Sequence, residues 1–204
     1  MPSILGAHRG TPAAAARAAQ APARLRQRAL GGDQTARPYD QGELLAQTSV
    51  RFRAQWGSGI CRVLVAQWLA EGGRLDQTYF AMADAQMRAQ RENGDAAGRL
   101  ATRAGFERLV GGQMDTDRAD MLENHGLTVV ASLARTSDPN ALAAFLVAGG
   151  LFYVRLSTAD DTQAHAVGVI IGPDGNRLFD PNTREVGGDV MAIARHLWRV
   201  LADW

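Results

Sequence analysis

The stretch of sequence that decides the fold is Gln55-Trp56-Gly57-Ser58-Gly59-Ile60-Cys61-Arg62-Val63-Leu64-Val65-Ala66-Gln67-Trp68-Leu69. After the Gly-Ser-Gly turn, apolar side chains recur every three to four residues and share one helical face. They are Cys61, Leu64, Val65, Trp68 and Leu69. Ser58 or Gly59 stands where an N-cap residue is expected. The pattern therefore predicts a buried helix with Cys61 in its first turn.

Downstream of this helix, the hydrophobic period changes from helical to alternating. Residues 77–109 have a helical pattern that Asn93-Gly94 interrupts, which predicts two helices. Beyond residue 124, alternating or continuous apolar runs predict strands, together with one short helix after a Pro. The predicted strands cover residues 125–133, 150–157, 164–171 and 177–180, and the short helix covers residues 140–147.

The last part of the chain predicts a β-hairpin and a closing helix. The turn sequence Gly-Pro-Asp-Gly at residues 172–175 joins the final two strands. An amphipathic pattern over residues 190–201 then predicts a helix. Helices first and antiparallel strands afterwards indicate the α+β class, with an N-terminal helical lobe packed on an antiparallel sheet.

Composition excludes several classes of protein. With 204 residues and 46% apolar side chains, the chain can bury the core of one domain without disulfides or a structural metal. All 22 basic residues are Arg, which excludes Schiff-base chemistry, a lysine base and the Gly-Lys-Ser/Thr phosphate loop. A formal net charge of +1 argues against nucleic acid as a partner. One Cys and four His fall short of a Cys-rich zinc site, so we expect no metal and no cofactor.

Residues 1–42 differ in composition from the rest of the chain. They are rich in Ala, Arg and Pro, with six Arg against two Asp and few large apolar side chains. Such a segment buries too little apolar surface to offset its ordering entropy, so we expect a flexible leader before a folded domain over residues 43–204. The longest apolar run, residues 141–154, is shorter than the roughly 18 residues that span a bilayer, and no signal-peptide pattern precedes it. Cleavage before Gly31 would expose a Gly-x-x-x-Thr acceptor for a myristoyl anchor, although a flexible linker is the simpler interpretation.

A cysteine, a histidine and an aspartate that follow one another along the chain suit nucleophilic catalysis by a thiol. The N-terminus of a helix supplies positive potential that stabilises a thiolate, and Cys61 has that position. His165 begins an apolar strand between two small alanines and is the candidate general base. Asp180 lies on the partner strand of the predicted hairpin, opposite residues 167–169, where a carboxylate can orient the imidazole. We therefore predict a Cys-His-Asp triad.

Two neighbouring residues complete the predicted site. Gln55 lies six residues before Cys61, so that its amide and the Cys61 backbone N–H could both donate to an oxyanion. Trp56, next to it, is a candidate for the wall of a substrate cleft. Taken singly, each triad residue has a simpler interpretation, namely a packing cysteine, a core histidine and a turn-forming aspartate. Their occurrence together in this order favours catalysis.

These residues resemble a known family. A Gln six residues before a Gly-Ile-Cys helix start is similar to the papain-like clan. Trp68 downstream, His-Ala-Val at 165–167 and Phe-Asp-Pro-Asn at 179–182 resemble the YopT-type cysteine proteases. The resemblance extends over residues 55–186 and is strongest over residues 142–182.

The resemblance implies a papain-like cysteine protease domain with Cys61 as nucleophile, His165 as general base and acid, and Asp180 as the orienting carboxylate. It also implies a bacterial effector, secreted by a specialised system, that cleaves a protein in the cytoplasm of a host or target cell. A glutamine deamidase or an acyltransferase toxin could use the same residues, because the outcome depends on what reaches the thioester. A binding module with a relic triad is the non-enzymatic alternative.

Overall fold

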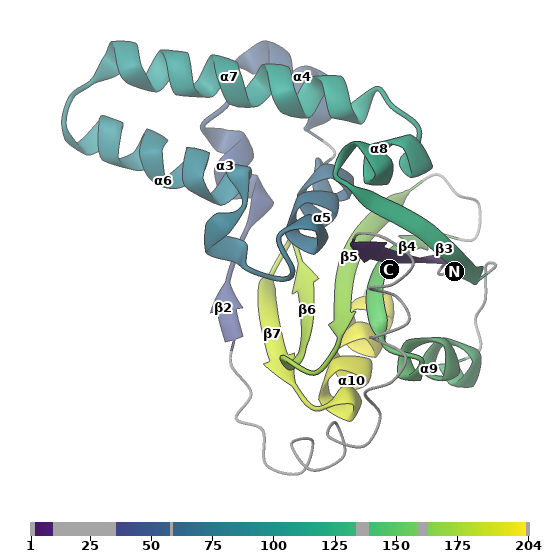
Figure 1. Cartoon of the computed structure of the whole chain (residues 1–204). Coiled ribbons are helices and arrows are strands. Elements are labelled where there is room, and N and C mark those ends of the chain that lie inside the picture. The colour runs from purple at the N-terminus through teal and green to yellow at the C-terminus, as the bar shows by residue number, and fades with distance from the viewer. Residues whose placement is uncertain (1–2, 10–35, 58, 134–138, 159–162, 203–204) are drawn as a thin grey trace.

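The computed structural model describes residues 3–9, 36–57, 59–133, 139–158 and 163–202. Within these residues, strands from both ends of the chain form one seven-stranded sheet (Figure 1). The strand order is β2-β7-β6-β5-β4-β1-β3, and every neighbouring pair is antiparallel. The strands are β1 (Ser3–Arg9), β2 (Ala36–Pro38), β3 (Leu127–Leu133), β4 (Gly150–Ser157), β5 (Ala164–Ile171), β6 (Asn176–Asp180) and β7 (Arg184–Gly188).

The helices lie on both faces of this sheet. A block of helices between β2 and β3 covers one face, and α9 and α10 cover the other (Figure 1). The helices are α3 (Gln41–Ala46), α4 (Val50–Trp56), α5 (Cys61–Ala70), α6 (Tyr79–Glu92), α7 (Ala96–Met114), α8 (Arg118–Asn124), α9 (Pro139–Val147) and α10 (Val190–Ala202), with a 3-10 turn at η1 (Leu75–Gln77). The expected α+β architecture, a helical lobe packed on an antiparallel sheet, is confirmed.

Two apolar cores form on opposite faces because successive side chains of a strand point to opposite sides of the sheet. In β4, Tyr153 belongs to the core that contains α5, whereas Phe152 and Val154 belong to the core beneath α9 and α10. In β6, Phe179 and Leu178 divide between the two cores in the same way. The continuous apolar character of these strands thus reflects burial on both faces.

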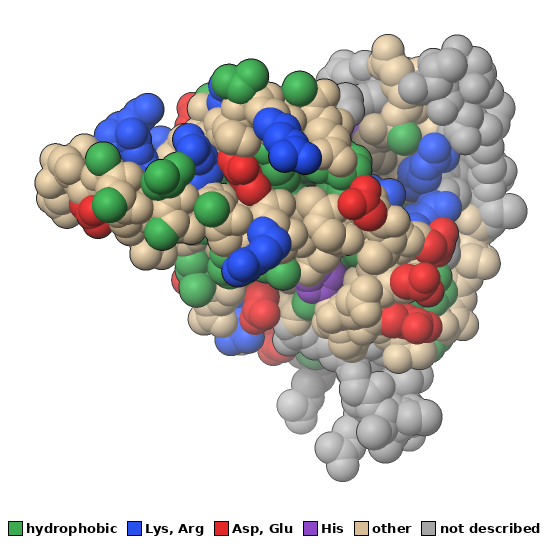
Figure 2. Space-filling model, turned by 90° about the horizontal axis from the view of Figure 1, so that it is seen from above, with side chains coloured by type: hydrophobic (Ala, Val, Ile, Leu, Met, Phe, Trp, Pro, Cys, Tyr) green, Lys and Arg blue, Asp and Glu red, His purple; other side chains and the backbone are tan. Residues whose placement is uncertain are grey.

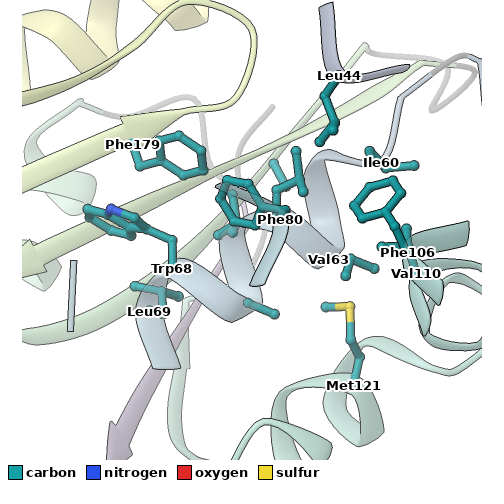
Figure 3. Packing of buried hydrophobic residues seen from close by; sticks show 14 of the residues in the cluster. Leu44, Ile60, Val63, Trp68, Leu69, Phe80, Phe106, Val110, Met121 and Phe179 are labelled. Atoms are coloured by element: carbon teal, nitrogen blue, oxygen red, sulfur yellow. The ribbon is translucent and has the colours of Figure 1, made fainter. Parts of the chain in front are cut away.

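Helix α5 is buried in the centre of the first core. Trp68 stacks on Phe179 with 5.5 Å between ring centroids, and Phe80 stacks on the same ring at 5.9 Å (Figure 3). Gly168 in β5 permits this close approach, because a Cβ atom there would lie 2.8 Å from the Trp68 ring. The helix therefore lies directly on β5 and β6, which fixes the position of Cys61 relative to His165.

The secondary structure predicted near the site agrees with the observed elements. Helix α5 begins at Cys61, and β4 and β5 have the predicted bounds. Phe179 pairs with Gly168, so Asp180 continues along the predicted hairpin register. The N-cap of α5 is Ile60 rather than the predicted Ser58 or Gly59, and it makes no side-chain cap.

Two segments of the predicted flexible leader form β-strands. Residues 3–9 form β1, which pairs with both β3 and β4, and residues 36–38 form β2, which pairs with β7. The composition argument missed these strands because it considered apolar side chains, whereas a strand also joins a sheet through its backbone N–H and C=O groups. Residues 10–35, including Gly31, lie outside the described residues. No helix in the described part of the chain is long and apolar enough to cross a membrane.

Candidate active site

Cys61 is the first residue of α5, and its side chain is half-buried. The N–H groups of the first helical turn have no partner within the helix, so the Cys61 N–H points to the region in front of the helix start. The turn into the helix needs Gly59, which has φ +129° and whose Cβ position lies 3.4 Å from the Gln41 amide nitrogen. The helix start thus presents a thiol and backbone donors together.

His165 and Asp180 form a buried pair. Their side chains are 2% and 3% exposed, and His165 Nε2 lies 2.8 Å from Asp180 Oδ1. Asp180 also accepts hydrogen bonds from the Asn182 N–H at 2.9 Å and from the Thr183 hydroxyl at 2.9 Å. The carboxylate is therefore fixed on three sides, and its position fixes the imidazole plane.

His165 also interacts with the side chain of Cys61. Burial alone would lower the pKa of His165, but hydrogen bonds to Asp180 and to the Cys61 side chain raise it to about 9. Burial would raise the pKa of Asp180, but the hydrogen bond from His165 and its positive charge hold that pKa below the ordinary value. Both effects favour the imidazolium form of His165 beside the Asp180 carboxylate. The structure thus brings the three predicted triad residues into one chain of interactions.

A cavity of about 660 Å³ opens beside the thiol. The lining residues are Cys61 from α5, Met114, Thr116, Asp117 and Arg118 around the α7–α8 connection, Tyr153 and Arg155 from β4, and residues 163–166 at the start of β5. Its volume lies in the range of small-molecule and peptide side-chain sites. Among the described residues, no group of three or more His, Cys, Asp or Glu is placed to hold a metal ion.

Gln55 and Trp56 are not part of this cavity. Helix α4, whose N-terminus Ser49 caps, carries Gln55 on its exposed face. Trp56 is partly buried against the first apolar core, and its indole nitrogen lies 3.7 Å from the Cβ position at Gly111. The prediction placed both residues beside Cys61. Their positions differ from it because α4 extends to residue 56, so the helix, and not the turn after it, sets the direction of these side chains.

A different glutamine supports the start of α5. Gln41 is buried, and its Oε1 accepts a hydrogen bond from the Ile60 N–H at 2.9 Å. Its Nε2 donates to the Asn182 side-chain oxygen. Gln41 therefore ties the residue before the nucleophile to the loop that holds Asp180. The sequence contains no local signal for this contact, because Gln41 and Asn182 lie 141 residues apart. The β2–β7 pairing and the hydrogen bond from the Gln41 N–H to the Pro181 carbonyl at 2.8 Å bring them together.

His125, the other histidine that follows the helical region, lies away from the thiol. It caps the end of α8, and its Nε2 is 3.2 Å from Gln113 Oε1. Burial lowers its pKa. It is not among the described residues that line the cavity, so His165 is the histidine positioned to act on Cys61.

Comparison with known proteins yields a limited likeness. No protein-family model matches the sequence, and no curated protein matches it. A search of solved structures finds the crystal structure of the Pseudomonas avirulence protein AvrPphB. The two chains share 17% sequence identity and superpose with a TM-score of 0.39, over 74% of this chain and 86% of that chain.

Proposed function

We propose that this protein is a papain-like thiol hydrolase that cleaves peptide bonds with a Cys61-His165-Asp180 triad. The observation that supports the proposal is that His165 contacts two groups, the Asp180 carboxylate at 2.8 Å from its Nε2 and the Cys61 side chain. A core histidine needs only one partner, whereas a general base must connect a nucleophile to an orienting group. The cavity next to Cys61 gives a substrate access to the thiol.

Each step of the proposed reaction is assigned to one of these groups. The Cys61 thiolate attacks the carbonyl carbon of the scissile bond, and the Cys61 N–H at the start of α5 stabilises the oxyanion. The His165 imidazolium donates its proton to the leaving amine, the C–N bond breaks, and a thioester remains. Water then attacks the thioester, His165 accepts the proton from that water, the C–S bond breaks, and the acid is released as the Cys61 thiolate and the His165 imidazolium are restored.

The nature of the acceptor and of the substrate amide distinguishes three products of this chemistry. Water acting on a main-chain amide gives two peptides, whereas water acting on a glutamine side chain gives glutamate and ammonia. An amine or hydroxyl acceptor gives acyl transfer. Peptide cleavage is the proposed reaction because the sequence resembles cysteine proteases, and the same resemblance supports a bacterial effector that acts on a host or target-cell protein.

The test is the alkylation rate of Cys61 by iodoacetamide from about pH 4 to about pH 9, a range that spans the pKa values of ordinary imidazoles and thiols. We expect the wild-type rate to persist below pH 6, because the His165 imidazolium stabilises the thiolate. The His165→Ala variant should show the titration of an ordinary thiol. His125→Ala is the matched control and should react like the wild type, since this histidine lies against Gln113.

Two results would contradict the catalytic proposal. If wild type and His165→Ala have the same pH profile, the imidazole does not activate the thiol. If Cys61 does not react in the folded protein, the thiol is inaccessible and the triad is a relic in a binding module. When the thiol proves active, mass spectrometry of a peptide library incubated with the protein separates cleavage from deamidation and acyl transfer, with Cys61→Ser as the inactive control.

A further inference from the structure

A second cavity, of about 600 Å³, lies in the helical lobe and is strongly basic. Its walls are the α3–α4 connection with the start of α4, the end of α6 and the start of α7. Arg53, Arg91, Arg99 and Arg103 line it, and none of its described lining residues is Asp or Glu. We propose that this arginine groove, defined by these four residues, binds a ligand that carries two or more phosphate groups.

The four guanidinium groups differ in how they are held. Arg53 is fixed, because its Nη1 donates to the Ala46 carbonyl at 3.1 Å and to the Thr48 carbonyl at 2.5 Å. These acceptors are neutral, so the positive charge of Arg53 is not compensated. Arg103 lies 3.8 Å from Glu107, which offsets part of its charge.

Arg91 and Arg99 face the groove from two different helices, at the end of α6 and in the first turns of α7. Within the described part of the chain, neither forms an ion pair with a carboxylate. The nearby Asp95 uses one carboxylate oxygen to cap α7, accepting from the Gly98 N–H at 2.8 Å. The groove therefore has an excess of positive charge, and two of its guanidinium groups are available to a ligand.

Phosphate chemistry fits this excess better than carboxylate chemistry. A phosphate monoester carries about −1.5 to −2 charge at pH 7, whereas a carboxylate carries one charge at most. The guanidinium fork binds phosphate oxygens in a bidentate manner, which favours Arg over Lys in such sites. Arginines from three helices, α4, α6 and α7, line this cavity of about 600 Å³, so a ligand with several phosphate groups matches the volume and the charge together.

The groove also has an apolar rim. Val50 and Leu100 line it and are 75% and 55% exposed. Figure 2 shows that Arg side chains (blue) alternate with exposed apolar side chains (green) along the arm that α6 and α7 form at the left. Phosphate groups next to an apolar part occur in phosphoinositide lipids, and free polyphosphates offer the same phosphate chemistry without it. Both sources satisfy the proposal, and the experiment separates them.

No lining residue is shared between the arginine groove and the cavity at Cys61. Phosphate binding at the groove is therefore independent of the proposed hydrolase activity, and either proposal can fail without the other.

The test is isothermal titration calorimetry of the full chain with inorganic tripolyphosphate at physiological salt. The Arg91→Ala/Arg99→Ala double variant removes the two available guanidinium groups. We expect its affinity to fall about 100-fold, because each lost charge-assisted hydrogen-bonding group is worth about tenfold. The Arg108→Ala/Arg195→Ala variant is the matched control: both arginines are exposed and lie outside the groove, and the same net charge is lost.

A second arm identifies the source of the phosphates. The full chain is sedimented with phosphatidylcholine vesicles that contain either phosphatidylinositol bisphosphate or phosphatidylserine. Binding to the first vesicles alone, lost in Arg91→Ala/Arg99→Ala, indicates a lipid headgroup. Binding of tripolyphosphate without vesicle binding indicates a soluble ligand.

Three results would overturn the proposal. The first is equal weakening in the two double variants, which would indicate general surface electrostatics. The second is the absence of binding to both tripolyphosphate and phosphoinositide vesicles. The third is competition for the wild-type groove by polyglutamate that is as strong as competition by tripolyphosphate. This result would indicate a docking site for an acidic protein segment instead.

Discussion

Substituting Asp180 by Asn tests how the triad is held together, because the change removes the charge but keeps the size. In Asp180→Asn the side-chain oxygen can still accept from His165 and from the Asn182 N–H, and the new amide can donate to the Thr183 hydroxyl. What disappears is the negative charge that favours the imidazolium. We therefore expect the pKa of His165 to fall from its wild-type value of about 9.

This loss has a defined dependence on pH. A His whose pKa is raised on folding stabilises the protein fully below its unfolded pKa of about 6.5, and the stabilisation is lost as pH rises through about 9. A pKa difference of that size corresponds to a free energy on the order of 3 kcal/mol, to which Asp180 and Cys61 both contribute against the opposing effect of burial. The lowered pKa of Asp180 adds stability above its unfolded pKa, and that part is lost in acid.

The assay is urea unfolding of wild type and Asp180→Asn at pH 6 and at pH 9.5, with reductant present. We expect the variant to be less stable by up to about 3 kcal/mol at pH 6, and we expect the difference to shrink at pH 9.5, where the wild-type imidazole is neutral. Asp76→Asn is the control; this side chain is 73% exposed, so its effect should stay within about 0.5 kcal/mol at both pH values. An Asp180→Asn effect of the same size at both pH values would refute the argument that an imidazolium–carboxylate pair stabilises the fold.

Three further predictions concern the support of the site. Gly168→Ala should destabilise the protein by about 1–3 kcal/mol in urea unfolding, because the new Cβ would lie 2.8 Å from the indole of α5; Gly112→Ala, with nothing within 4 Å of its Cβ position in α7, should leave stability unchanged or raise it. Gln41→Ala should lower the free energy of unfolding by about 1–3 kcal/mol and slow Cys61 alkylation, because it leaves the buried Ile60 N–H without an acceptor. Gln55→Ala should change neither the stability nor the alkylation rate. A slower alkylation rate in Gln55→Ala would support Gln55 as an oxyanion donor. Deletion of residues 1–9 should lower the thermal midpoint, because β1 pairs with strands on both of its sides; an unchanged midpoint would show that the domain does not need this strand.

The sequence by itself determined the elements whose signals are local. The helix start at Cys61 follows from a glycine turn and a helical apolar period, and the β5–β6 hairpin follows from a Gly-Pro-Asp-Gly turn between two apolar runs. These two predictions placed His165 and Asp180 on neighbouring strands, and the structure has them 2.8 Å apart. Short-range periodicity and turn chemistry suffice here because the hairpin partners are close in sequence.

The tertiary structure alone decided which residues support that site. Gln41 binds the residue before the nucleophile, whereas Gln55, which has the expected sequence spacing, lies on an exposed helix face. Spacing along the chain cannot predict this exchange, since strand β2 pairs with β7 and carries the segment before α3 next to the loop at Asn182. The strand at residues 3–9 is a similar case, because its partners in β3 and β4 lie more than a hundred residues away and their backbone groups leave no pattern in the sequence. The residues of the proposed triad were thus predictable from local signals, whereas the residues that contact them were set by long-range pairing that only the folded chain reveals.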